Sequence, residues 1–275
     1  MKKYITIISI IMAVMMLWST VAFAGVDDTC IAMGADLDDS GMDTVLNIFG
    51  IDYLDDYNVI EITNKDEHKY LEGYVDEDQI GTQALSCVMI TETDDEDIDV
   101  ETHNINYCTE DMYENALETA GIHGAKVIVA APYSISGTAA LVGTIKAYEE
   151  MSGHKVHDDV VEAAVEELTT TGDLGDEIGD KETATDIIGD LKDMLADNPD
   201  MSDADIIQAI KDLADKYGVL LSDKQIEKIK KMITGFKGID IDWGGLKDKA
   251  QDLVNQAEKS GFFDKLITWF KSLFK

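Results

Sequence analysis

The sequence predicts an α/β (α+β) N-terminal domain with a mixed sheet, followed by an all-α C-terminal region. Up to residue 152, short β-branched or apolar runs alternate with segments of helical periodicity, whereas the later part shows helical patterns only. Between these parts, the run TTTGDLGDEIGD (169–180) has a glycine spacing that fits neither helix nor strand. The predicted parts are a signal peptide (1–24), an α/β domain (25–172), a linker (173–180), a helical domain (181–260) and an amphipathic terminal helix (261–275).

Each element of the first half has a local signature. Runs rich in β-branched or apolar residues predict strands at 29–34, 58–62, 85–91, 98–105 and 126–132. Helical patterns that start at N-cap residues or end at glycine predict helices at 39–49, 64–71, 109–120 and 137–152. The acidic turn ETDDED between the third and fourth strands indicates that these two strands form a hairpin.

The second half contains four helical segments with clear boundaries. Asn198-Pro199 separates the first from the second, because proline cannot continue a helix. Ser202 and Ser222 are good N-caps, and Ser222 forms a capping box with Gln225. The predicted helices are 181–197, 202–217, 222–236 and 244–259.

The N-terminus has the pattern of a secretory signal peptide. Lys2 and Lys3 precede an apolar run (5–17), and Ala22-Phe23-Ala24 supplies a small-x-small cleavage site. The apolar run is shorter than the roughly 20 residues that a membrane span needs. We therefore expect a secreted, cell-envelope-associated protein whose mature chain starts at Gly25.

Charge excludes one class of partner. The net charge is −34, and all 22 basic residues are lysine. Without arginine the chain has no bidentate clamp for phosphate or guanine, and its charge repels a nucleic-acid backbone. Residues 224–275 differ from the rest, because they carry eleven lysines and seven acidic residues. We expect no nucleic-acid partner, and an acidic body with a mildly basic tail.

The last fourteen residues, FFDKLITWFKSLFK, form an amphipathic helical pattern. At 100° per residue, eight large apolar side chains fall on one arc and the lysines on the rest. Such a face suits a helix that lies in a membrane interface or docks to another protein, and a helix docked on its own domain is the alternative. The candidate docking residues are Phe262, Phe263, Leu266, Ile267, Trp269, Phe270, Leu273 and Phe274.

Three cysteines, Cys30, Cys87 and Cys108, permit at most one internal disulfide. Cys87 and Cys108 flank the predicted hairpin and could approach each other, but we favour three buried thiols that act as small hydrophobic residues. No Cys/His spacing indicates a zinc site. The stretch 36–47 imitates a calcium loop but has Asp43 and Asn47 at its eighth and twelfth positions, so it is interpreted as a helix start. We predict no metal and no cofactor.

Polar residues follow the predicted strands where ligands gather in α/β sheets. The binding candidates are Asp36, Thr63, Asn64, Asn104, Gly137 and Thr138. Weak catalytic candidates are His103 as a base with Ser134 or Ser136 as a nucleophile. The turn before residue 138 lacks the Walker and G-x-S-x-G patterns, yet a helix N-terminus there can bind a carboxylate or phosphate. The simpler interpretation, which we favour, is that Ser136 caps the helix and Gly137 lets the helix pack against the strand.

Several motifs resemble one known family. They are MGADL (33–37), KYLEGYV (69–75), IGTQALS (80–86) and the long block from VETHNIN to AAPYSISGTAALVGTIKAYE (100–149). This pattern is similar to the YpuA-like exported proteins of Gram-positive bacteria, the domain-of-unknown-function family 1002. The resemblance implies secretion or envelope association, and it implies no activity and no catalytic residues.

The sequence supports two main functional hypotheses, and an acidic, calcium-responsive surface protein is a third possibility. The first is a non-enzymatic, exported binding or scaffolding module with a docking tail. The alternative is a secreted hydrolase that acts on a cell-wall component through His103 and one of the two serines.

Overall fold

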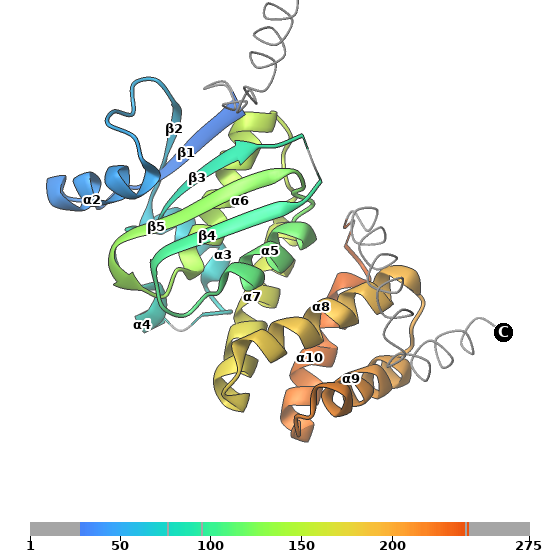
Figure 1. The fold of residues 1–275 in the computed structure, drawn as a ribbon. Helices are drawn as coiled ribbons and strands as arrows, with labels where there is room; N and C mark the ends of the chain where they lie inside the picture. Colours follow the sequence, from blue (N-terminus) through green and yellow to red (C-terminus); the bar gives the residue numbers. More distant parts are fainter. Residues whose placement is uncertain (1–27, 76, 95, 240, 242–275) are drawn as a thin grey trace, which may run out of the picture.

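The structure, a computed structural model, describes residues 28–75, 77–94, 96–239 and 241 (Figure 1). The predicted signal peptide, the predicted helix 244–259 and the terminal amphipathic segment lie outside the described residues. The described chain has an α/β half followed by a run of helices, as the sequence predicts.

A five-stranded mixed sheet forms the centre of the first half. Its strands lie in the order β2 (Asn58–Ile62), β1 (Thr29–Gly34), β3 (Cys87–Glu92), β5 (Ala125–Ile135) and β4 (Ile98–Ile105). β1 is parallel to β2, β4 is parallel to β5, and β3 runs antiparallel to both of its neighbours. The carboxyl ends of β1, β2, β4 and β5 therefore meet at one edge of the sheet.

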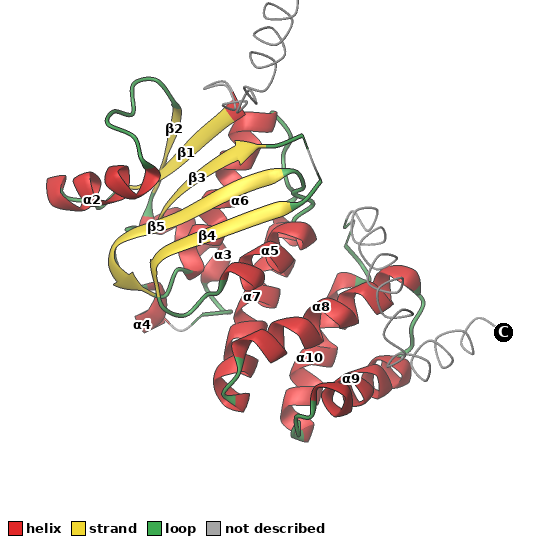
Figure 2. Ribbon diagram, in the orientation of Figure 1, coloured by secondary structure: helices red, strands yellow, loops and turns green. Residues whose placement is uncertain are grey.

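Helices cover both faces of this sheet (Figure 2). α2 (Asp39–Phe49) packs on one face through a small cluster that includes Val45 and Phe49. α3 (Asn64–Leu71), α5 (Glu110–Thr119) and α6 (Thr138–Ser152) cover the other face and form the larger core. The short α4 (Glu77–Ile80) lies in the connection between α3 and β3.

The predicted hairpin between the third and fourth strands is wrong, because β5 lies between them. Val129 of β5 pairs with Val88 of β3, and Val127 of β5 pairs with Val100 of β4. β5 carries the most continuous apolar run, and a strand with that character is stabilised by neighbours on both sides. A hairpin would have left β5 at an edge.

The run 169–178 is helical, and the prediction that it is irregular is wrong. It forms the second half of α7 (Asp158–Ile178). The glycines that suggested a linker mark close packing instead. A Cβ atom on Gly172 would lie 2.4 Å from the Tyr107 hydroxyl, and one on Gly175 would lie 2.6 Å from Cγ of Lys181. These two side chains need the space that glycine leaves.

The remaining helices start and end where the sequence predicts them within one residue. They are α8 (Lys181–Asp197), α9 (Asp203–Tyr217) and α10 (Asp223–Phe236). Ser202 and Ser222 are the N-caps of α9 and α10, and both form capping boxes. These caps satisfy backbone N–H groups that the first turn of a helix leaves without partners.

α7 belongs to both hydrophobic cores. Val161 and Leu168 pack into the core of the α/β half, whereas Ala163 and Leu174 pack into the core formed with α8, α9 and α10. In Figure 1, α7 lies between the helices behind the sheet and the C-terminal helices. One helix therefore joins the two halves through opposite faces.

A buried ion pair reinforces this junction. Nζ of Lys192 on α8 lies 2.8 Å from Oε1 of Glu167 on α7, and both side chains are 1% exposed. The Thr119 hydroxyl donates to the second carboxylate oxygen of Glu167, and Lys192 also donates to the backbone carbonyl of Asn115 on α5. Both charges are thus compensated where three helices from the two halves meet.

The three cysteines are free and buried. Cys87 belongs to the cluster under α2, whereas Cys30 and Cys108 belong to the core on the opposite face of the sheet. Burial raises the pKa of Cys30 to about 11 and those of Cys87 and Cys108 to about 12. All three thiols are therefore protonated at neutral pH and behave as small hydrophobic residues.

Replacing Lys192 by methionine should lower the free energy of unfolding by about 3–5 kcal/mol, because Glu167 would remain buried without its counter-charge. Chemical denaturation monitored by circular dichroism measures this loss. Lys126→Met, which removes an exposed lysine 4.0 Å from Asp99, should change stability little.

The double variant Lys192→Met with Glu167→Gln should be more stable than Lys192→Met alone, because no buried charge is left. Equal stability of Lys192→Met and the unmodified protein would contradict this assignment.

Candidate functional site

A pocket of about 470 Å³ lies at the sheet edge where the four strands with a common direction end. Its polar walls come from α3, the segment before β3, the turn after β4 and the start of α6. Apolar side chains, among them Leu85 and Ile135, complete the lining. The polar lining residues are Glu67, Thr82, Gln83, Ser86, Asn106, Tyr107, Ser136 and Thr138.

Glu67 is the ionisable acid in this lining. Its side chain belongs to the inner face of α3, and the residue is 2% exposed. Within the described residues it accepts one hydrogen bond, from the Asn64 amide at 3.0 Å. Burial raises the pKa of Glu67 to about 7, and the negative charges of Asp36 and Asp66 add to this rise, while the Asn64 hydrogen bond and His68 oppose it. A carboxyl with this pKa can take up or release a proton near neutral pH.

Two predicted candidates hold the pocket wall in place without lining it. The Asp36 carboxylate accepts a hydrogen bond from the Ala84 amide at 2.8 Å and so fixes the segment before β3. Asn64 donates to Glu67 and also to the Gly81 carbonyl at 3.3 Å. Thr63, the third candidate of this group, is the N-cap of α3 and forms a capping box with Asp66.

The turn before α6 contributes two predicted candidates to the pocket, Ser136 and Thr138. Their hydroxyl oxygens lie 3.4 Å apart. The favoured prediction that Ser136 caps the helix is wrong, because Gly137 takes the N-cap position with φ +89° and no side-chain cap bond. Glycine is required there, since a Cβ atom would lie 2.5 Å from the Tyr113 hydroxyl. The first turn of α6 therefore faces the pocket without a capping side chain.

His103, Asn104 and Ser134 lie outside the pocket lining. His103 Nε2 is 2.8 Å from the Glu101 carboxylate, and the Ser134 hydroxyl accepts from Asn106 at 2.9 Å. Within the described residues, neither Ser134 nor Ser136 hydrogen-bonds to His103. Asn104 has φ +61° at a bulge between β4 and β5 and donates to the Ala131 carbonyl, so its role there is structural.

Tyr107 connects the pocket to the helical half. It lines the pocket, and its hydroxyl donates to Asp173 of α7 at 2.9 Å. The Lys181 ammonium lies 3.9 Å from the centre of its ring and donates to its backbone carbonyl at 2.6 Å. One wall of the pocket therefore rests on α7 and α8.

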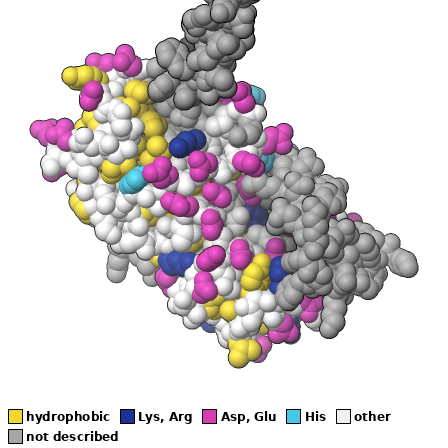
Figure 3. All heavy atoms as spheres, in the orientation of Figure 1, with side chains coloured by type: hydrophobic (Ala, Val, Ile, Leu, Met, Phe, Trp, Pro, Cys, Tyr) yellow, Lys and Arg dark blue, Asp and Glu magenta, His cyan; other side chains and the backbone are white. Residues whose placement is uncertain are grey.

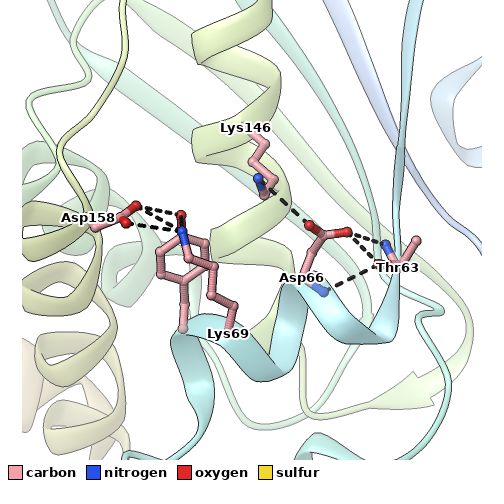
Figure 4. A network of polar contacts seen from close by, with 6 residues as sticks. Thr63, Asp66, Lys69, Lys146 and Asp158 are labelled. Carbon is pink, nitrogen blue, oxygen red and sulfur yellow. Dashed lines mark hydrogen bonds and ion pairs between the residues drawn. The ribbon is translucent and has the colours of Figure 1, made fainter.

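A network of polar contacts fastens α3, the helix that carries Glu67 (Figure 4). The Lys69 ammonium and the Tyr70 hydroxyl both bind the Asp158 carboxylate at the start of α7, at 3.0 and 2.8 Å. Asp66 lies 3.9 Å from Lys146 of α6. The backbone that positions Glu67 is thus tied to two neighbouring helices.

The electrostatic surroundings are acidic. Figure 3 shows acidic side chains spread over the visible face of both halves with few lysines between them. Of the described residues that line the pocket, none is a lysine or a histidine. In the described chain, no group of three or more histidine, cysteine, aspartate or glutamate side chains is placed to hold a metal ion.

Comparison with known proteins decides the family. The family model described as "Protein of unknown function (DUF1002)" matches residues 33–253. The chain belongs to this family. It is also similar to the uncharacterized protein YpuA of Bacillus subtilis (strain 168), with 39% identity over 264 residues that cover 92% of this chain and 90% of the relative. No solved structure matches the chain.

Glu67, Ser86, Asn106 and Tyr107 line the pocket but are absent from the sequence-based candidates. Glu67 follows the N-cap of a short polar helix, where a glutamate is usually solvent-exposed, so the local pattern gave no signal of burial. Asn106 directly follows β4 and could have been found by the same rule that selected Asn64. Ser86 precedes an antiparallel strand, which that rule does not cover.

The stability of the protein should increase as the pH falls from 8 to 5.5. The pKa of Glu67, about 7, lies above the ordinary value near 4.3, so the folded state binds this proton more tightly than the unfolded state. One such group changes the free energy of unfolding by at most about 1.4 kcal/mol per pH unit. Urea denaturation across this pH range measures the slope.

Glu67→Gln should reduce this slope, whereas the matched variant Glu72→Gln, at an exposed position at the end of α3, should keep it. Asp193 on α8, whose pKa burial raises to about 7, supplies a slope that all three proteins share. Identical slopes in the Glu67→Gln variant and the unmodified protein would rule out the assignment to Glu67.

Proposed function

We propose that this protein is an exported, cell-envelope-associated binding module that takes a small polar molecule in the pocket at the sheet edge. The observation that carries the proposal is the pocket itself, in which hydroxyl, amide and carboxyl groups converge from four separate segments. Its volume, about 470 Å³, falls in the range of small-molecule sites. Membership of a family of unknown function is compatible with this activity and does not name the ligand.

Binding is favoured over covalent catalysis by the contacts of the polar groups. Within the described residues, Glu67 has no hydrogen bond to a serine, threonine or cysteine that it could activate. The three thiols are buried and protonated, and His103 is paired with Glu101 outside the pocket. A nucleophile with an adjacent base, the arrangement that covalent catalysis needs, is not assembled among these groups.

Export and attachment are proposed from the sequence. The signal-peptide pattern of residues 1–24 supports export, and the apolar face of residues 262–275 supports docking to a membrane surface or an envelope protein. Among the described helices, none is both long and apolar enough to cross a membrane. The amphipathic pattern of residues 262–275 is the feature from which we propose attachment.

A panel of small envelope constituents should reveal the binding activity. Neutral sugars, amino sugars, amino acids, short peptides and glycerol phosphate would be tested by thermal denaturation of residues 25–275. A ligand of the folded state raises the melting temperature, by about 2–4 °C per kcal/mol at this chain length.

Ala139→Phe and Ser136→Phe place a ring at the pocket lining and should each abolish the rise, with folding checked by circular dichroism. A rise that persists in both folded variants, or no rise with any compound, would refute the proposal.

Liposome flotation should separate the attachment from the binding. Residues 25–275 should float with vesicles that contain anionic lipid, or with envelope membranes, and residues 25–261 should not. Attachment through the terminal segment is excluded if both forms float equally or if neither form floats with either preparation.

A further inference from the structure

Two walls of the pocket favour ligand groups of opposite charge. The inference that follows rests on the proposed function, because it concerns the ligand of that pocket. One wall carries the Glu67 carboxyl on α3, and another is the first turn of α6 with Ser136 and Thr138.

Glu67 forms no ion pair with a lysine within the described residues, and the adjacent His68 is the basic side chain that favours its charged form. The fully buried Glu167 of the same protein provides the comparison, because it has Lys192 at 2.8 Å and the Thr119 hydroxyl as a second donor. Glu67 is 2% exposed, yet its single hydrogen-bond donor within the described residues is the neutral Asn64 amide. A buried carboxylate is stabilised strongly by a nearby cation. The pocket beside Glu67 has room for one from outside.

The first turn of α6 favours the opposite charge. α6 has 15 residues, and its N-terminus carries the positive end of the helix dipole together with N–H groups that point out of the helix. Gly137 at the N-cap offers no side chain to these groups, and the Ser136 and Thr138 hydroxyls lie beside them. The Glu67 carboxylate makes no hydrogen bond to this turn in the described structure, so it does not serve as the cap.

We propose that the pocket binds a zwitterion that carries an ammonium and a carboxylate, as a free α-amino acid does, or as a short peptide does at its two ends. The ammonium pairs with Glu67, and the carboxylate lies at the first turn of α6. A purely anionic ligand is disfavoured by the net charge of −34. An organic cation fits better than a metal ion, because the described residues offer no group of three metal ligands there.

Four matched probes test this assignment by isothermal titration calorimetry on residues 25–275. Alanine and alanyl-alanine carry both charges, propionate carries only the carboxylate, and isopropylamine carries only the ammonium. The better of the two zwitterions should bind at least tenfold more tightly than propionate and than isopropylamine.

Two isosteric variants then separate the two walls. Glu67→Gln should weaken the zwitterion at least tenfold and leave propionate unchanged or tighter, whereas Thr138→Val should weaken the zwitterion and propionate alike. Glu72→Gln removes an equal charge from an exposed position and should bind as the unmodified protein does. Circular dichroism confirms that each variant is folded.

The zwitterion assignment fails if propionate or isopropylamine binds as tightly as the zwitterions, or if Glu67→Gln binds them unchanged. It also fails if neither zwitterion binds but a neutral sugar or glycerol phosphate binds to the pocket. Binding to the pocket is established when Ala139→Phe abolishes it. In that last case the proposed function stands with another ligand class. If no compound binds at all, the proposed function fails as well.

Discussion

The fold depends on the junction at which Lys192 and Glu167 meet in the protein interior. Two buried charges are costly to desolvate. They are compensated by each other, by the Thr119 hydroxyl that donates to Glu167, and by the Asn115 carbonyl that accepts from Lys192, so that α5, α7 and α8 are held in one arrangement. Tyr107, which lines the pocket, packs on α7 through Asp173 and on α8 through Lys181. The geometry of the pocket is thus supported by the helical half as well as by the sheet.

Most elements could be predicted because their ends carry local signals. Ser202 and Ser222 cap helices where the sequence places them, and Gly50 ends α2. The failures are non-local. The hairpin prediction failed because strand order depends on which strand is stabilised most by a neighbour on each side. The glycines of α7 were misinterpreted because they make room for the side chains of Tyr107 and Lys181, which come from other segments.

The candidate site shows the same division. The rule that ligands gather at the carboxyl ends of strands selected Ser136 and Thr138, which line the pocket, and Asp36 and Asn64, which support its wall. Glu67 was missed because a glutamate on a short polar helix is usually exposed. The segment that shares the pocket with it, which Asp36 and Asn64 hold at Ala84 and Gly81, comes close only in the folded chain.

Because α7 belongs to both cores, the two halves of the protein are expected to evolve together. If the α/β half were separated before residue 158, it would lose Val161 and Leu168 from its own interior; if cut after α7, it would display Ala163 and Leu174 to water. Neither cut yields a self-sufficient module. The family match, which spans both halves, accords with a single evolutionary unit that gene fusion and shuffling cannot easily divide.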